Sequence, residues 1–136
     1  MTTDWHRHRA PNLAEFESIA NAAYRDLPAR FRDMTKEVLI RVEDFPTEEV
    51  LSSLGIESPF GLLGLYHGVD LTRQSVLDAS PLPEMIFLYR RPILDYWSSH
   101  DDRLGDIITH VLVHEIGHHF GLSDDDMARI ESEAAS

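Results

Sequence analysis

Apolar residues recur at intervals of three and four over the first part of the chain, which is the period of an α-helix. The run begins after Asn12, a residue type that caps helix N-termini, and the pattern continues to about Pro28 or Phe31. Residues 1–11 are polar and lack this period. We therefore predict a flexible N-terminal arm over residues 1–11 and a single domain over residues 12–136.

Three later segments have the pattern of β-strands. Residues 36–45 alternate apolar side chains with charged ones, which is typical of a strand with one buried face. Residues 61–67 and 84–93 are mostly apolar, and each predicts a further strand. The segment between these two, through Pro81 and Pro83, predicts a loop.

Two helices are predicted among and after these strands. Thr47 is a candidate cap for a short helix that ends at Gly55. A longer helix is expected over about 103–120, with Asp101 or Asp102 as its cap. Apolar residues lie on nearly all sides of the longer helix, so we expect it to be buried in the middle of the domain.

A last helix is predicted at the C-terminus. Gly121 is placed to end the long helix, because a residue without Cβ can take the positive φ that reverses the chain there. Ser123 can cap the following helix, which has an acidic first turn and continues through Ala135.

The charge balance excludes several classes of function. The chain has 24 Asp and Glu residues against 12 Lys and Arg, a formal net charge of −12. Such a surface repels phosphate backbones and anionic lipids, so we expect no nucleic-acid or membrane partner. No segment resembles a secretory signal or a membrane span, which favours a cytoplasmic location. Because the chain has no Cys, any metal must be held by His and carboxylate side chains.

The long helix carries the pattern H-E-x-x-H. His114 and His118 are four residues apart, so they stand on one helix face and can reach one metal ion. Glu115 lies at the flank of that site, where it can accept a proton from a metal-activated water. Gly121 turns the chain back toward the metal, and Asp124 follows as a candidate third ligand. This set leaves a fourth position open, as in catalytic zinc sites.

The third ligand has competitors. Asp125 and Asp126 directly follow Asp124, and either could take its place. A helix N-terminus with solvated acidic residues is the other interpretation of this run. The ligand types also suit iron(II) or cobalt as well as zinc.

The string over residues 114–124, together with residues 65–68 and 84–93, resembles the small bacterial zincin-like metallopeptidase family. The resemblance covers most of the chain, from about Leu13 to Met127. It implies a minimal zincin-like single domain of the α+β class, with helices packed on a short twisted mixed sheet and one zinc ion on the long helix.

The resemblance also implies roles for individual residues. His114 and His118 become zinc ligands, Glu115 the general base, and Asp124 the third ligand. The sequence resembles metzincins as well through Gly121, but Asp124 stands where those enzymes have a third His. Met127 lies too near to be their Met-turn, so a deep substrate groove is not expected.

Other polar residues have both a chemical and a plain structural interpretation. His110 lies one turn before His114 and either approaches the site or makes a supporting hydrogen bond, whereas His119 points elsewhere and is interpreted as structural. Candidate donors to a reaction intermediate, each with a surface or packing role as the alternative, are His67, His100, Tyr66, Tyr89 and Tyr96. Residues interpreted as solvated are His6, His8, Arg73, Arg90 and Arg91.

The pattern as a whole predicts a zinc-dependent metallopeptidase that hydrolyses peptide bonds. The expected partner is a peptide or protein substrate, bound as an extended strand along the sheet edge at 84–93. One alternative is a catalytically silent, zincin-derived metal-binding module that acts through a protein partner. Two others are a zinc hydrolase of non-peptide amides and a metal-free helical domain.

Overall fold

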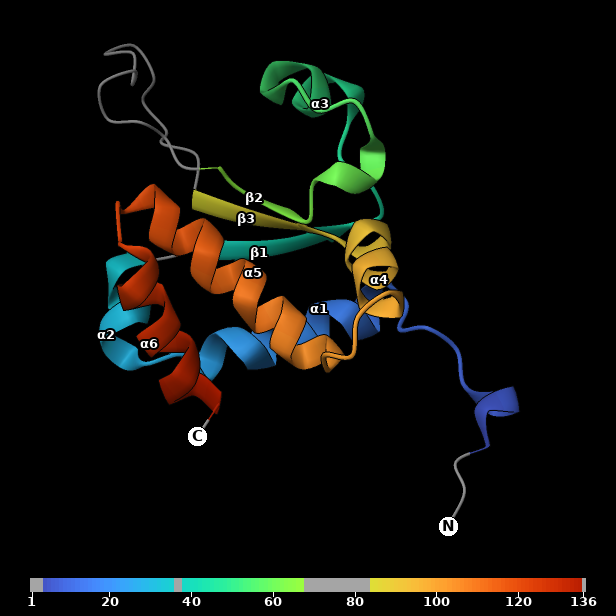
Figure 1. Cartoon of the computed structure of the whole chain (residues 1–136), viewed down its shortest axis with the longest axis horizontal. Helices are drawn as coiled ribbons and strands as arrows, with labels where there is room; N and C mark the ends of the chain where they lie inside the picture. The colour runs from blue at the N-terminus through green and yellow to red at the C-terminus, as the bar shows by residue number, and fades with distance from the viewer. Residues whose placement is uncertain (1–3, 36–37, 68–83, 136) are drawn as a thin grey trace.

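The computed structural model describes residues 4–35, 38–67 and 84–135, and it shows helices packed on a small mixed sheet (Figure 1). The predicted α+β class is confirmed. Arg73 and the loop predicted through Pro81 and Pro83 lie outside the described residues.

The described residues form a sheet of three strands, β1 (Val38–Glu43), β2 (Gly64–His67) and β3 (Glu84–Tyr89). Their order is β1-β3-β2, with β3 parallel to β1 and antiparallel to β2. The central strand β3 buries Ile86 and Leu88 completely. The interpretation of 84–93 as a sheet edge is therefore wrong, because β3 has a hydrogen-bonded neighbour on each side.

The first helix begins where the sequence predicts it, but it ends at Arg25, before the predicted end at about Pro28 or Phe31. Helix α1 (Leu13–Arg25) starts after Asn12, whose side chain accepts the Glu15 N–H at 2.8 Å while Glu15 bonds back to Asn12. This reciprocal pair satisfies N–H groups that the first turn leaves free. A separate short helix, α2 (Ala29–Arg32), follows Pro28. Helix α3 (Glu48–Leu54) lies on the side of the sheet opposite to α1 and α5 (Figure 1).

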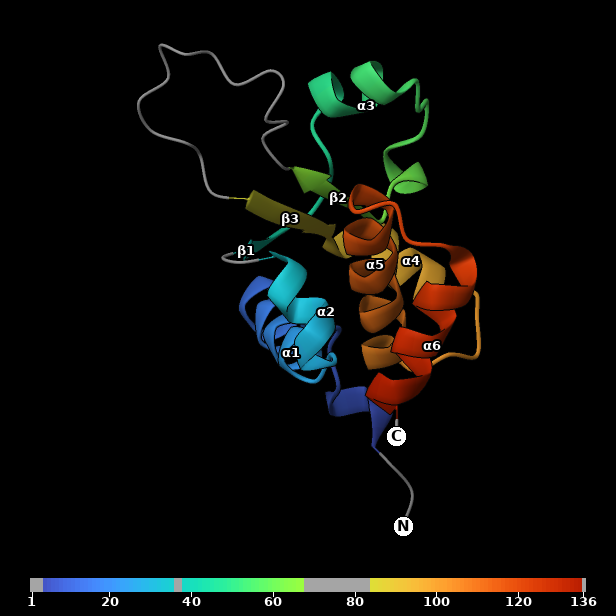
Figure 2. The same ribbon diagram turned by 90° about the vertical axis from the view of Figure 1, so that its left-hand side faces the viewer.

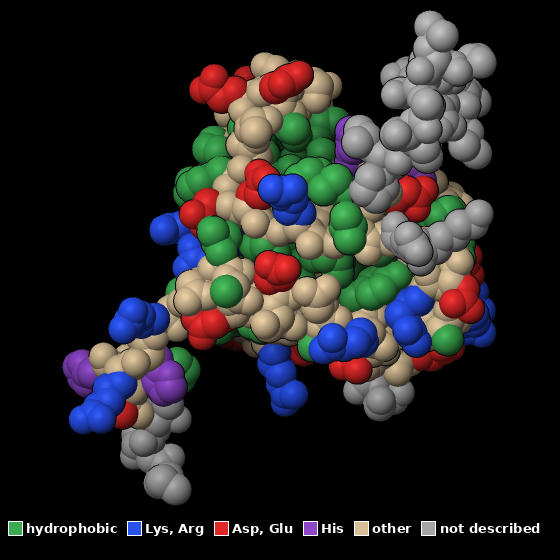
Figure 3. Space-filling model, turned by 180° about the vertical axis from the view of Figure 1, so that it is seen from behind, with side chains coloured by type: hydrophobic (Ala, Val, Ile, Leu, Met, Phe, Trp, Pro, Cys, Tyr) green, Lys and Arg blue, Asp and Glu red, His purple; other side chains and the backbone are tan. Residues whose placement is uncertain are grey.

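Both ends of α3 follow the prediction. Thr47 accepts the Val50 N–H at 3.2 Å, and Gly55 ends the helix with φ +69°. The strand predicted over 61–67 begins only at Gly64, since Pro59–Gly61 form a 3-10 turn. Figure 3 shows apolar side chains at the surface of this end of the molecule.

The strand predicted over 84–93 is too long by four residues. It ends at Tyr89, and helix α4 (Arg90–Ser98) begins at the next residue. A continuous apolar run cannot separate a buried strand from a buried helix start, and Pro92 is tolerated in a first helical turn because the N–H groups there have no intrahelical partner.

Arg90 is not the solvated residue that its sequence position indicates. Its side chain is only 12% exposed; Nε donates to the Pro11 carbonyl at 2.6 Å, and Nη1 lies 3.2 Å from the Asp44 carboxylate. The neighbouring Arg91 is more exposed and lies 3.7 Å from the same carboxylate. Arg90 therefore ties the start of α4 to the chain before α1 and to the end of β1.

Helix α5 (Leu104–His119) is the centre of the domain. It lies under the sheet beside α1, with α6 (Asp124–Ala135) on its other side (Figure 2). Ile108, Leu112 and Ile116 are completely buried, which confirms the predicted central helix. The prediction that Asp101 or Asp102 caps this helix is wrong, because Arg103 occupies the N-cap position and no side chain caps the helix there. None of the described helices is both long and apolar enough to cross a membrane.

The turn between α5 and α6 uses Gly121 as predicted. Gly121 has φ +71°, and the Leu122 N–H donates to the Gly117 carbonyl at 2.8 Å, which closes a Schellman turn. Ser123 then caps α6, because its hydroxyl accepts the Asp126 N–H at 3.1 Å. This short turn folds α6 back along α5.

Gly117 allows α6 to pack closely against α5. A Cβ atom at this position would lie 2.4 Å from the Sδ of Met127, which is completely buried. Gly105, near the start of the same helix, has nothing within 4 Å of a corresponding Cβ. The two glycines of α5 therefore differ in packing while sharing a helical backbone.

We expect Gly117→Ala to lower the free energy of unfolding by about 1–3 kcal/mol, because Met127 must move in a packed interior. Gly105→Ala is the matched control and should be neutral or stabilising by up to about 1 kcal/mol, the gain in helix propensity. Urea denaturation followed by circular dichroism measures both. Equal stability of Gly117→Ala and wild type would contradict the proposed close packing.

Candidate metal centre

Three histidines form a stripe along one face of α5. His110, His114 and His118 are spaced four residues apart, so they stand one above the other on consecutive turns. The ring centroids of His110 and His114 are 4.0 Å apart, and those of His114 and His118 are 5.5 Å apart. The pairing of His114 with His118 on one face follows the sequence prediction.

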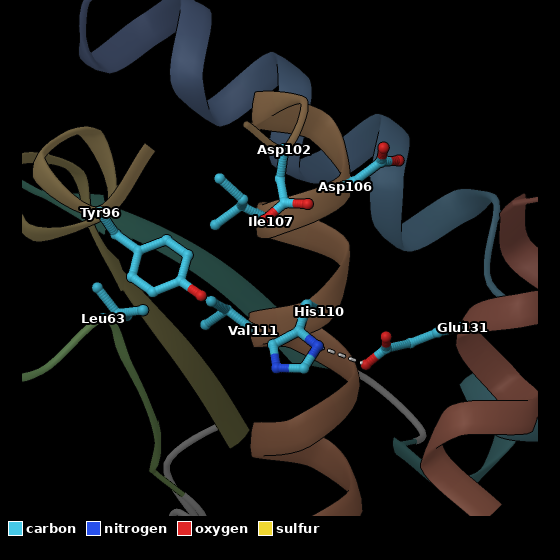
Figure 4. Close-up of a pocket in the computed structure, with 8 residues that line it drawn as sticks. All are labelled: Leu63, Tyr96, Asp102, Asp106, Ile107, His110, Val111 and Glu131. Atoms are coloured by element: carbon cyan, nitrogen blue, oxygen red, sulfur yellow. Dashed lines mark ion pairs between the residues drawn. The ribbon is translucent and has the colours of Figure 1, made fainter. Parts of the chain in front are cut away.

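Helix α6 brings a carboxylate to this stripe. Oε1 of Glu131 lies 2.8 Å from Nδ1 of His110 and 3.2 Å from Nε2 of His114 (Figure 4 shows the His110 contact). This oxygen is buried and, despite its two close nitrogens, has no contact with the geometry of a hydrogen bond. An unsatisfied buried oxygen between two imidazoles is unusual and calls for an explanation.

The spacing of these atoms suits a metal ion. The ligand atoms of His110, His114 and Glu131 all lie within 4.8 Å of one another. Ligands bound tetrahedrally at zinc distances lie about 3.4 Å apart, close to the separation of Glu131 from His114. Imidazole nitrogen with carboxylate oxygen is also a donor set that zinc and similar divalent ions accept. The residues present therefore fit a resident cation.

His114 is electrostatically prepared for such a role. Its pKa is lowered first by burial and then by the neighbouring His110, while the charge of Glu131 acts in the opposite direction. A lowered pKa keeps the ring neutral, and only the neutral ring has a nitrogen lone pair free for a metal.

The acidic residues predicted as third ligands have different positions. Asp124 is the first residue of α6, where its charge opposes the lowering of the His114 pKa, but it is not part of the compact group formed by His110, His114 and Glu131. Asp126 is used elsewhere, since it completes the Ser123 cap and pairs with Arg129. The assignment of Asp124 as a ligand stays a prediction.

Glu131 is the site residue that the sequence reasoning missed. A signal for it exists, because it lies one turn after Met127 and next to Ile130, both on the buried side of α6. An acidic residue at the border of an apolar helix face, opposite a histidine stripe, is a ligand candidate. In the sequence alone, the acidic run at 124–126 is the more conspicuous source of a third ligand.

Glu115 lies on the other flank of the stripe, against the sheet. The backbone N–H of Tyr66 donates to its carboxylate. The pKa of Glu115 is raised, chiefly by burial, although Tyr66 and His118 oppose the shift. A raised pKa makes the carboxylate a better proton acceptor than an exposed glutamate.

The strand that supplies this N–H, β2, lies at the edge of the sheet formed by the described residues. Leu63 O accepts the Tyr89 N–H at 3.0 Å, so residues 63, 65 and 67 direct their backbone groups toward β3. The alternate residue Tyr66 therefore directs its N–H to the open side of β2, which is the side where Glu115 lies. The catalytic candidate thus sits between α5 and the outer edge of β2.

The remaining candidates, apart from the exposed His67, have packing contacts. His119 stacks on Tyr66 with ring centroids 4.0 Å apart, and the Tyr66 hydroxyl donates to Glu84. His100 stacks on Tyr96 at 3.8 Å and contacts the Tyr96 carbonyl. His67 is exposed at the end of β2, and Tyr89 is buried with its pKa raised to about 12 by desolvation.

Comparison with known proteins gives a family for this arrangement. A scan against protein-family models matches residues 35–134 to the family described as zincin-like metallopeptidase, and a search of the curated proteins finds no match. The matched residues include the three strands of the described sheet, α5 and nearly all of α6, and with them the stripe, Glu115 and Glu131. The chain therefore belongs to the zincin-like metallopeptidase family.

Proposed function

We propose that this protein is a zinc-dependent metallopeptidase that hydrolyses peptide bonds, with Glu115 as its general base. The observation that carries the proposal is the arrangement around α5: a histidine stripe contacted on one flank by the half-buried carboxylate of Glu131, and Glu115 on the other. Family membership supports the same reaction class.

The proposed zinc ligands are His114, His118 and Asp124, with Glu131 as a second carboxylate candidate. His114 is common to both possible sets, because it faces His118 on one side and Glu131 on the other. If Asp124 is the ligand, Glu131 instead orients the His114 ring from behind, which is a common role of carboxylates near metal-bound imidazoles.

A zinc ion held there would supply Lewis acidity, lowering the pKa of a water ligand and polarising a carbonyl oxygen. Glu115 is placed to take the proton that this water loses and to deliver it to the leaving amine, so one carboxylate acts first as base and then as acid. Its partial burial favours proton uptake, and the Tyr66 N–H holds its orientation.

An extended peptide would bind along the outer edge of β2, in place of the edge expected from the sequence. β2 is an edge strand of the described sheet, and it packs against α5. Main-chain hydrogen bonds to an edge strand are a general mode of peptide recognition.

Glu115→Gln should reduce peptidase activity by about 10²–10⁴-fold while the zinc content stays unchanged, because the amide cannot accept the proton. Cleavage of a mixed peptide library by the zinc-loaded protein, followed by mass spectrometry, measures the activity. Glu17→Gln, an exposed residue of α1, is the matched control and should cleave as wild type does. Zinc-loaded wild type with no cleavage, or with activity equal to Glu115→Gln, would contradict the proposal and favour a silent metal-binding module.

We expect about one zinc ion per wild-type chain, measured by elemental analysis of untagged protein, and its loss in His114→Ala and in His118→Ala. Glu131→Gln should weaken zinc binding by about 10–100-fold, whether Glu131 is a ligand or orients His114. Asp124→Asn separates these two roles. Unchanged zinc affinity in Asp124→Asn would rule out Asp124 as the third ligand.

A further inference from the structure

A cavity of about 390 Å³ opens beside the metal centre, along the N-terminal half of α5 (Figure 4). His110 and Glu131 line one end of it. The His110 ring is 4.0 Å from that of His114, so the cavity begins directly next to a proposed zinc ligand. Its volume is within the range of small-ligand pockets in proteins.

The walls of the cavity are apolar. Ile107 and Val111, two buried residues of α5, form one side, and Leu63 before β2 lies opposite. The ring of Tyr96 from α4 covers the remaining side. A side chain that enters would therefore pass along aliphatic and aromatic surface.

The end away from the metal centre is acidic. Asp102 and Asp106 line it (Figure 4), and neither carboxylate makes an ion pair or a hydrogen bond with any described residue. Neither Lys nor Arg is among the described residues that line the cavity. The cavity thus combines apolar walls with two carboxylates that no described cationic side chain neutralises.

We propose that this cavity is the specificity pocket for a Lys or Arg side chain, so that the substrates are peptides with a basic residue near the cleaved bond. The inference rests on the proposed function for the cleavage itself. Its binding component can be tested independently of turnover.

A basic side chain matches both parts of the cavity. The aliphatic stem of Lys or Arg packs on apolar surface while its charged end seeks polar partners. Asp102 and Asp106 can accept charge-assisted hydrogen bonds from that end. An aliphatic side chain would displace water from these carboxylates without replacing the hydrogen bonds that the water makes. An acidic side chain would be repelled by their charge.

The test uses short peptides identical except at one position, which holds Arg, Lys, norleucine, citrulline or Glu. Binding to zinc-loaded Glu115→Gln protein is followed by fluorescence anisotropy, and cleavage by wild type is measured in parallel. We expect the Arg and Lys peptides to bind about tenfold more tightly than the norleucine and citrulline peptides, the scale of one partly exposed charge-assisted contact. The preference should shrink at high salt.

The double variant Asp102→Asn/Asp106→Asn should lose this preference. The matched control is Asp95→Asn/Asp101→Asn, which makes the same change in net charge at exposed residues that do not line the cavity and should keep the preference. Equal binding of all peptides, no binding of any, or a preference that survives Asp102→Asn/Asp106→Asn would overturn the pocket assignment. Charge-selective binding without cleavage by wild type would uphold the pocket and reject the peptidase function.

Discussion

The burial of α5 is the constraint on which the rest of the structure depends. This helix is apolar on nearly every side, so it must be enclosed by the sheet, by α1 and by α6 together. His110, His114 and His118 lie along one strip of its surface that these neighbours leave partly open. The same hydrophobic burial that stabilises the domain therefore fixes the histidines in line. The geometry of the candidate metal centre therefore follows from core packing.

The second helix of the site depends on a small residue. Gly117 leaves room for Met127, and this close approach sets the distance between α5 and α6. Glu131 lies one turn beyond Met127, so its reach toward His114 is determined by that contact. The xx positions of the H-E-x-x-H pattern thus have a structural task of their own. Ile116 is buried in the core, while Gly117 receives the neighbouring helix.

Much of this arrangement could be predicted because it rests on local chemistry. The capping pair of Asn12 with Glu15, the turn at Gly121 and the all-round burial of α5 are each encoded within a few residues. The features that were missed depend on contacts between distant segments. Strand order placed β3 in the centre of the sheet, which no local pattern reveals. Glu131 likewise acquires meaning only after α6 has folded back on α5, and Arg90 only after β1 and the chain before α1 have met beside it.

The contacts of Arg90 connect the segment that the family model matches to the chain before it. The family match begins at residue 35, yet Arg90 holds the Pro11 carbonyl, and Phe16 and Ala20 of α1 are completely buried in the core. Removing everything before residue 35 would uncover the side of α5 that α1 now covers and leave a buried guanidinium without its carbonyl partner. The segment that the family model matches is thus shorter than the piece of chain that builds the core, and α1 is an integral part of the domain.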